Sequence, residues 1–120
     1  MKRLLTTLIL GLTALFLAAC SNQNSLDGEY YEIDEYSNDK IIVIKGDEGT
    51  VVAEAATRNM TVDTDLQTFE VSGFVNPTVT YEYKDGVLTA NFTGSDETYY
   101  KKGTNAYEDA LEKYDYSDDN

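Results

Sequence analysis

The sequence predicts a mainly β domain: a small antiparallel meander that forms a barrel or half-barrel of about seven strands, with one C-terminal helix. Three observations support this fold class. From Gly28 onward, short runs of β-branched and aromatic residues alternate with turns rich in Gly, Asp and Asn. The dipeptide Asp85-Gly86 separates two alternating runs, as in a tight hairpin. Near the C-terminus, apolar residues recur at helical spacing. A two-sheet β-sandwich is the alternative fold.

Residues 1–19 have the layout of a secretory signal peptide. Lys2 and Arg3 form a charged front, and an apolar run and small residues follow. The uncharged stretch from Leu4 to Ala19 has 16 residues. A helix needs roughly 20 apolar residues to cross a bilayer. We therefore expect this segment to be cleaved and not to remain as a membrane span.

The signal segment ends in Leu17-Ala18-Ala19-Cys20, which resembles the bacterial lipobox, where a peptidase cuts before a lipid-bearing cysteine. Cys20 is the only cysteine, so no disulfide can form within the chain. Stable anchoring takes more than one acyl chain, such as palmitate, at roughly 0.8 kcal/mol per buried CH₂. Cys20 is the predicted lipidation site, and residues 20–26 form the predicted tether. The expected location is the extracellular face of the cell membrane.

The expected β-domain covers residues 27–103. Its strands are predicted at Gly28–Ile33, Lys40–Lys45, Thr50–Ala55, Gln67–Ser72, Thr78–Lys84, Val87–Phe92 and Glu97–Lys101. The apolar run Ile41–Ile44 does not alternate, which predicts a strand covered on both faces. We expect residues 46–49 to join this strand to the next one in a second hairpin.

The turn at Asp85-Gly86 also predicts a strand register. A type I′ turn at this dipeptide places apolar and aromatic partners on one face of the hairpin. The predicted pairs are Tyr83 with Leu88, Tyr81 with Ala90 and Val79 with Phe92.

A C-terminal helix is predicted within residues 104–114. Asn105 and Glu108 have the spacing of a capping box that begins the helix at Asn105. Its apolar stripe consists of Tyr107, Ala110, Leu111 and Tyr114. Residues 115–120 then form an acidic tail that we expect to fray.

The charge balance excludes one class of partner. The whole chain has nine basic and 22 acidic residues and no histidine, for a net charge of −13. Cleavage before Cys20 removes two basic residues and no acidic one, so the charge becomes −15. Phosphate backbones are bound through Lys and Arg, so we expect no nucleic-acid partner. The charge also serves solubility.

The residue types present argue against catalysis. Without histidine, and with Cys20 assigned to lipid, the chain has neither a histidine-based triad nor the usual zinc ligands. Only carboxylates remain, and no pair of them stands out in the sequence. We therefore expect no enzyme activity and no cofactor, with calcium as the one alternative.

Two sets of residues are candidate binding sites. Asp34, Glu35 and Asp39 fall in one predicted loop, and clustered carboxylate oxygens can bind calcium. Solvated loop carboxylates are the simpler interpretation. Ten tyrosines include the neighbours Tyr30-Tyr31 and Tyr99-Tyr100, and neighbours in a strand face opposite sides. Outward rings at Tyr31, Tyr99 and Tyr100 could stack on a ligand, although tyrosine also suits half-buried strands without one.

Several of these features together resemble a family. They are Cys20, Leu26-x-Gly28-x-Tyr30-Tyr31, Asp85-Gly86-Val87-Leu88 and Tyr99-Tyr100-Lys101-Lys102. With them the chain resembles small cell-surface lipoproteins of streptococci and related Gram-positive bacteria, which have a reduced lipocalin-like β-domain. The strands here are shorter than those of true lipocalins, which argues against a roomy cavity.

The resemblance implies a non-enzymatic binding or accessory role at the cell surface. The expected partners are the membrane, through Cys20, and an envelope protein or cell-wall ligand. A cation-binding or stress-protective envelope protein that uses its acidic loops is the alternative.

Overall fold

The computed structural model describes residues 25–116. The predicted signal peptide, Cys20 and most of the tether lie outside the described residues, and so do residues 117–120 of the expected tail. The described elements are β1 (Gly28–Ile33), β2 (Asn38–Lys45), β3 (Glu48–Ala53), β4 (Ala56–Asp63), β5 (Thr68–Val71), β6 (Thr78–Lys84), β7 (Val87–Ala90), β8 (Glu97–Lys101) and helix α2 (Asn105–Lys113).

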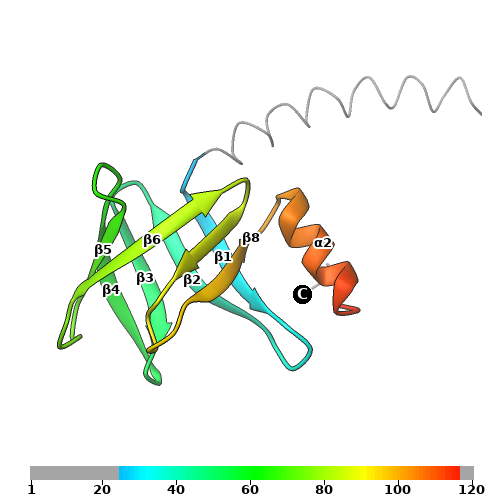
Figure 1. Cartoon of the computed structure of the whole chain (residues 1–120), viewed down its shortest axis with the longest axis horizontal. Helices are drawn as coiled ribbons and strands as arrows, with labels where there is room; N and C mark the ends of the chain where they lie inside the picture. The colour runs from blue at the N-terminus through cyan, green and yellow to red at the C-terminus, as the bar shows by residue number, and fades with distance from the viewer. Residues whose placement is uncertain (1–24, 117–120) are drawn as a thin grey trace, which may run out of the picture.

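The eight strands form one closed antiparallel barrel in which each strand pairs with its neighbours in the sequence (Figure 1). The first and last strands close it, because Tyr30 pairs with Lys101 and Tyr31 with Tyr100. Closure pairs the strand edges that would otherwise be open to another chain. The predicted barrel with one C-terminal helix is confirmed, and the sandwich alternative is not.

The predicted strand number was one too low, because β4 was missed. The expected strand Thr50–Ala55 in fact ends at Ala53, and Glu54 and Ala55 form the turn into β4. Both turn residues have positive φ, 55° and 62°, as a type I′ turn requires. Asn-Gly or Asp-Gly usually marks such a turn, and Glu-Ala gives no such signal.

The register of the Asp85-Gly86 hairpin is confirmed for its first two apolar pairs, Tyr83 with Leu88 and Tyr81 with Ala90. Asp85 and Gly86 have φ values of 49° and 88°. The predicted third pair is wrong, because β7 ends at Ala90. The side chain of Asn91 accepts a hydrogen bond from the N–H of Gly94 at 2.8 Å. This local turn takes Phe92 out of the ladder opposite Val79, although Phe92 stays buried.

The second predicted hairpin is also present, with Gly46-Asp47 as a two-residue turn between Lys45 and Glu48. The expected burial of its first strand on both faces is only partly correct. Ile42 and Ile44 are buried inside the barrel, whereas Ile41 and Val43 are half-buried on the outer face. Within residues 25–116, the outer side chains Ile41 and Val43 are covered less fully than the inner side chains Ile42 and Ile44.

The barrel interior is packed with side chains. The Phe69 ring stacks on Tyr81 with centroids 4.4 Å apart and on Phe92 at 5.8 Å. An eight-stranded barrel is just wide enough for side chains to fill it or to hold one small ligand. Here the buried interior set is Tyr30, Ile42, Ile44, Val51, Ala53, Met60, Val62, Phe69, Val71, Val79, Tyr81, Leu88, Ala90, Phe92 and Tyr99.

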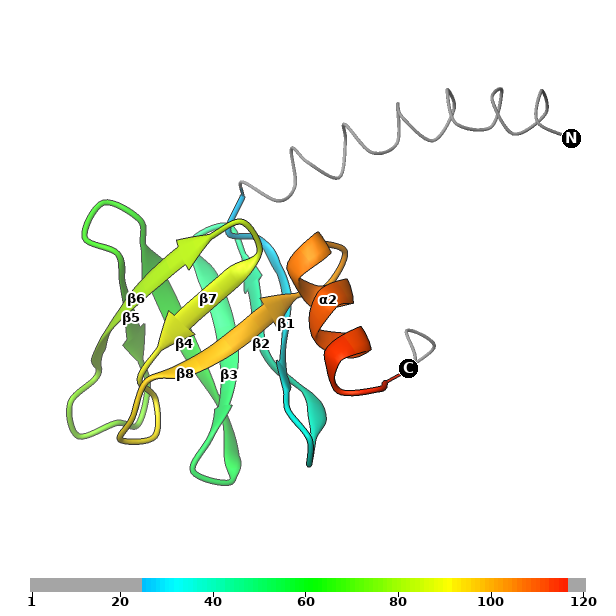
Figure 2. The ribbon, with the colours of Figure 1, turned by 45° about the vertical axis from the view of Figure 1, so that its right-hand side comes forward.

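Helix α2 packs against the outer face of β1 and β8 (Figure 2). Tyr107, Ala110 and Leu111 are buried against Ile33, as the predicted stripe requires. The predicted cap was one residue late. Thr104 caps the helix, because its hydroxyl oxygen accepts a hydrogen bond from the N–H of Tyr107 at 3.3 Å. Residues 25–116 contain no helix with the length and hydropathy needed to cross a bilayer.

The described start of the expected tail is hydrogen-bonded to the rest of the domain. The hydroxyl of Tyr116 donates a hydrogen bond to the carbonyl oxygen of Asp34 at 2.8 Å, and the N–H of Tyr116 donates to Leu111. The first bond ties Tyr116, beyond the end of α2, to the loop between β1 and β2, and the second holds it on the last turn of the helix.

The turns and loops between the strands lie at two opposite ends of the barrel, the proximal end and the distal end. The proximal end, where β1 begins, holds residues 25–27, 46–47, 64–67, 85–86 and 102–104. The distal end holds residues 34–37, 54–55, 72–77 and 91–96. Figure 1 shows the start of β1 and the loop between β4 and β5 at the same end of the barrel.

Candidate functional site

The tyrosines that the sequence suggested as ligand platforms are not free surfaces. The predicted alternation is present, with Tyr30 and Tyr99 inside and their neighbours outside. Tyr99 is 3 % exposed and lies in the core, so it cannot stack on a ligand from solvent. Helix α2 covers the two outer rings in part. The ring of Tyr31 lies against that of Tyr107 with centroids 5.4 Å apart, and Tyr100 packs on the same cluster.

The acidic loop has a structural use. One carboxylate oxygen of Asp34 accepts hydrogen bonds from the N–H of Tyr36 and Ser37, each at 2.8 Å, and from the Ser37 hydroxyl. These bonds, the one from Tyr36 first, lower the pKa of Asp34. Asp39 lies in β2, paired with Glu32. No group of three or more carboxylate, histidine or cysteine side chains in residues 25–116 is arranged to hold a metal ion. Calcium binding by Asp34, Glu35 and Asp39 stays an untested prediction.

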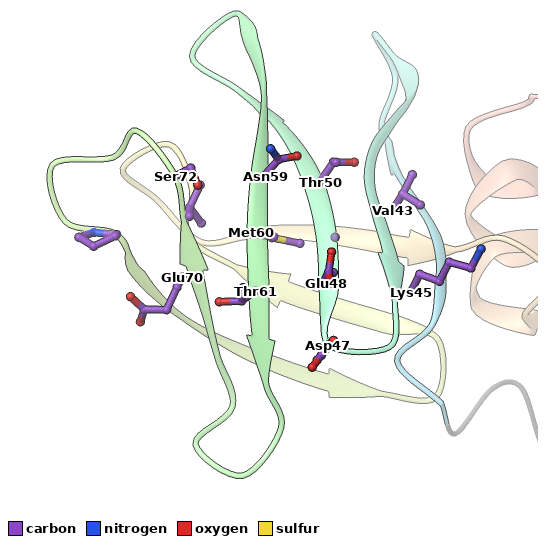
Figure 3. A pocket seen from close by; sticks show the side chains of 13 residues that line it. Val43, Lys45, Asp47, Glu48, Thr50, Asn59, Met60, Thr61, Glu70 and Ser72 are labelled. Atoms are coloured by element: carbon purple, nitrogen blue, oxygen red, sulfur yellow. The ribbon is translucent and has the colours of Figure 1, made fainter.

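A groove of about 790 Å³ runs across the outer face of β2, β3, β4 and β5 (Figure 3). Strand register arranges its side chains in two rows, because paired residues face the same side of a sheet. One row is neutral and consists of Val43, Thr50, Asn59 and Ser72. The other contains three charged residues and one threonine, and consists of Lys45, Glu48, Thr61 and Glu70.

Between the two rows lies a position without a side chain. Gly49 sits between Ile44 and Met60 in the sheet. A Cβ atom on Gly49 would lie 2.5 Å from the carbonyl oxygen of Val43, so β2 and β3 approach closely here. Glycine inside a strand often marks such a close approach or a bend.

The groove is suited to a polar ligand of positive charge. Its ionisable groups are three carboxylates, Asp47, Glu48 and Glu70, and one ammonium, Lys45. Glu70 accepts a hydrogen bond from the hydroxyl of Thr78 at 2.6 Å, which orients its carboxylate. The neutral row adds hydroxyl and amide groups that donate and accept hydrogen bonds.

Sequence reasoning missed this groove, because it depends on strands that are separate in the chain. Asn59 and Thr61 belong to β4, which was not predicted. Thr50 and Ser72 are adjacent to that strand only once the register is known. The signal that could have found the groove is the alternation of Met60 and Val62 with polar neighbours, which is typical of a strand.

A smaller hollow of about 520 Å³ lies at the distal end, where β6 and β7 separate beyond Tyr81 and Ala90. Phe74 forms part of its wall and lies under the guanidinium of Arg58, 5.3 Å from the ring centroid. Asn76, Asn91 and Asp96 supply its polar groups. Its walls come from two loops and the start of β6, whereas the groove on β2 to β5 is built mainly on paired strands.

The chain was compared with protein-family models, with curated proteins and with solved structures. None of the three comparisons gives a match. Function therefore has to be inferred from the residues and their geometry.

Proposed function

We propose that this chain is a lipid-anchored cell-surface protein with a non-enzymatic binding or accessory role, and that its partner binds in the groove on β2 to β5. The observation that carries the proposal is a preformed polar groove on the outside of a barrel whose interior is already filled. Acylation of Cys20 supplies the anchor. The lack of histidine in the sequence supports binding over catalysis.

The packed interior favours recognition by the outer surface. Tyr30, Phe69 and Leu88 are each 0 % exposed and occupy the space that a lipocalin-like cavity would need. A ligand inside the barrel would have to displace these side chains, which is costly because protein interiors are close-packed. The outer groove needs no such rearrangement, since strands hold its two rows.

Charge indicates the class of partner. The mature chain has a net charge of −15, and the groove has three carboxylates and one ammonium. Such a surface attracts cations over several ångströms and speeds their association. We therefore propose a basic, extended segment of an envelope protein as the partner. A cell-wall ligand is the alternative that the experiment distinguishes.

Photocrosslinking in living cells tests the groove directly. A photoreactive amino acid replaces Asn59, in the neutral row of the groove, or Asp109, on the exposed side of α2. We expect one dominant protein adduct from position 59 and none from position 109. Equal adducts from both positions would contradict the groove as the binding surface. An adduct with wall polymer at position 59 would support the cell-wall alternative.

Charge-neutral variants test the proposed chemistry. Asp47→Asn with Glu48→Gln removes two carboxylates of the groove and should weaken the adduct, and raised salt should weaken it in the wild type. Asp109→Asn with Glu112→Gln removes the same charge from α2 and serves as the matched control. Equal adduct yields in both double variants would contradict the charge-based recognition.

The anchor has its own test. Cys20→Ala should leave the signal uncut or release the protein from cells, and it should abolish incorporation of labelled palmitate. Normal processing together with unchanged membrane retention would contradict lipidation at Cys20.

A further inference from the structure

The chain enters the barrel at a fixed point of the proximal end. Lys101 Nζ donates a hydrogen bond to the carbonyl oxygen of Ser25 at 2.5 Å, and the Tyr30 hydroxyl donates to that of Leu26 at 2.5 Å. The carboxylate of Asp27 accepts from the N–H of Gly46 at 2.9 Å. Leu26 also packs against the core. Residues 25–27 are therefore part of the folded body and not of a loose tether.

Lys101 holds this entry point from inside the barrel mouth. It is 3 % exposed, and its ammonium lies 5.9 Å from the centroid of the Tyr83 ring. Gly28 leaves room for its stem, because a Cβ atom there would lie 2.7 Å from Lys101 Cε. If residues 25–26 moved away, the buried ammonium of Lys101 would lose its hydrogen bond to Ser25, and losing a partner is costly for a buried charged group.

The length of chain before this point limits how far the barrel can stand from the membrane. Five residue steps separate Cys20 from Ser25. A fully extended chain spans at most about 3.6 Å per residue, or about 18 Å for five. An acylated Cys20 lies at the membrane surface, so the proximal turns face that surface at short range.

One large apolar side chain at the proximal end is exposed to solvent. Leu66, in the loop between β4 and β5, is 71 % exposed. The carboxylate of Asp63 accepts hydrogen bonds from the N–H of Asp65 and of Leu66, each at 3.0 Å, and so fixes this loop. Figures 1 and 2 both show the loop at the end where β1 begins.

We infer that the proximal end of the barrel rests on the bilayer, with Leu66 at the level of the lipid headgroups. This inference rests on the proposed lipid anchor. Exposed carboxylates at Asp63 and Asp65 mean that charge does not draw this end to anionic lipids. The short tether and the apolar side chain account for the contact instead. The distal end, with the 98 % exposed Val75, then points away from the membrane.

Fluorescence quenching tests this orientation, because the chain has no tryptophan of its own. The full acylated protein is reconstituted in phosphatidylcholine vesicles whose acyl chains are brominated. We expect the emission of Leu66→Trp to shift to the blue and to be quenched several-fold more than that of Val75→Trp. Both replaced side chains are exposed, so both variants should fold, which their melting temperatures check.

Each outcome decides between the inference and its premise. If both variants float with the vesicles and are quenched equally, or if Val75→Trp is quenched more, the orientation is wrong while the anchor stands. If neither variant floats with the vesicles, the lipid anchor itself is wrong and the orientation fails with it.

Inserting about ten Gly and Ser residues after Gln23 lengthens the tether and should reduce the quenching of Leu66→Trp. Unchanged quenching would show that the tether does not hold Leu66 at the membrane.

Discussion

The side chain of Thr104 occupies the space beside Gly86, since a Cβ atom on Gly86 would lie 2.5 Å from the Thr104 hydroxyl oxygen. Thr104 caps helix α2, and Gly86 is the second turn residue of the β6–β7 hairpin. The N–H of Lys101 also donates to the carbonyl oxygen of Gly86 at 2.8 Å. The helix cap and the best-predicted hairpin are thus packed against each other at the proximal end.

Gly86→Ala should destabilise the protein more than Gly46→Ala does. Both glycines have positive φ, 88° and 67°, so both substitutions carry a backbone cost of about 1–2 kcal/mol. Only Gly86 lacks room, whereas nothing lies within 4 Å of a Cβ atom at Gly46. Overpacking should add about 1–3 kcal/mol at Gly86. Urea unfolding of both variants measures the difference, and equal losses would contradict the contact.

Thr104→Ala should cost about 1 kcal/mol of stability, because it removes the helix cap. Thr104→Ser keeps the hydroxyl and should retain most of the stability. Asn105→Ala tests the cap position that the sequence suggested and should have little effect. Chemical unfolding of the three variants measures these changes. A larger loss for Asn105→Ala than for Thr104→Ala would place the cap at Asn105 instead.

The fold was predictable where local rules and packing agree. Asp85-Gly86 specified both its turn and the pairs next to it, and the stripe through Tyr107 and Leu111 specified the buried face of α2. Prediction failed where a turn lacked its usual residues, as at Glu54-Ala55. It also failed where a side-chain hydrogen bond ended a strand early, as Asn91 does.

Glu32→Gln should raise stability at neutral pH. Burial raises the pKa of the Glu32 carboxyl. The neighbouring Glu97 raises it further, both by charge repulsion and by a side-chain hydrogen bond. The folded state therefore binds this proton more tightly than the unfolded state does. The resulting stability is present below the ordinary carboxyl pKa and is lost as pH rises through the raised value. Gln cannot ionise, so the variant should avoid this loss.

Melting temperatures measured from acidic to neutral pH test the Glu32 prediction. Glu35→Gln, in the exposed loop between β1 and β2, is the control and should follow the wild type. If Glu32→Gln also followed the wild type across this range, the carboxyl would not carry the predicted pH dependence.

Calcium should leave the melting temperature of the protein unchanged. A ligand that binds only the folded state raises its stability in proportion to RT ln(1 + [L]/Kd). The carboxylate of Asp34 already accepts three hydrogen bonds, and the described residues bring no three acidic side chains together for a metal. A rise with calcium that disappears in Asp34→Asn or Asp39→Asn would instead support the cation-binding alternative.

The candidate site was less predictable than the fold. Residues such as Thr50, Asn59 and Ser72 look like ordinary outward positions in the sequence, and only the register brings them into one row. Tyrosines stood out by composition, yet the helix that covers Tyr31 and the core that holds Tyr99 depend on tertiary packing. Local patterns specify which side chains face outward, but not which outward faces another element covers.

Tyr99→Phe should make the protein more resistant to alkaline unfolding. Burial, with the nearby carboxylates of Glu32 and Glu97, raises the pKa of the Tyr99 hydroxyl above its ordinary value of 10.0. Because the unfolded chain loses this proton at lower pH, Tyr99 costs stability as pH rises above that ordinary value. Phe has no proton to lose, so the unfolding midpoint should move to higher pH.

Tyr36→Phe is the control for the Tyr99 prediction, since Tyr36 is 86 % exposed. Circular dichroism follows unfolding during an alkaline titration while tyrosinate absorbance follows ionisation. A midpoint in Tyr99→Phe that equals those of the wild type and Tyr36→Phe would show that Tyr99 does not drive alkaline unfolding.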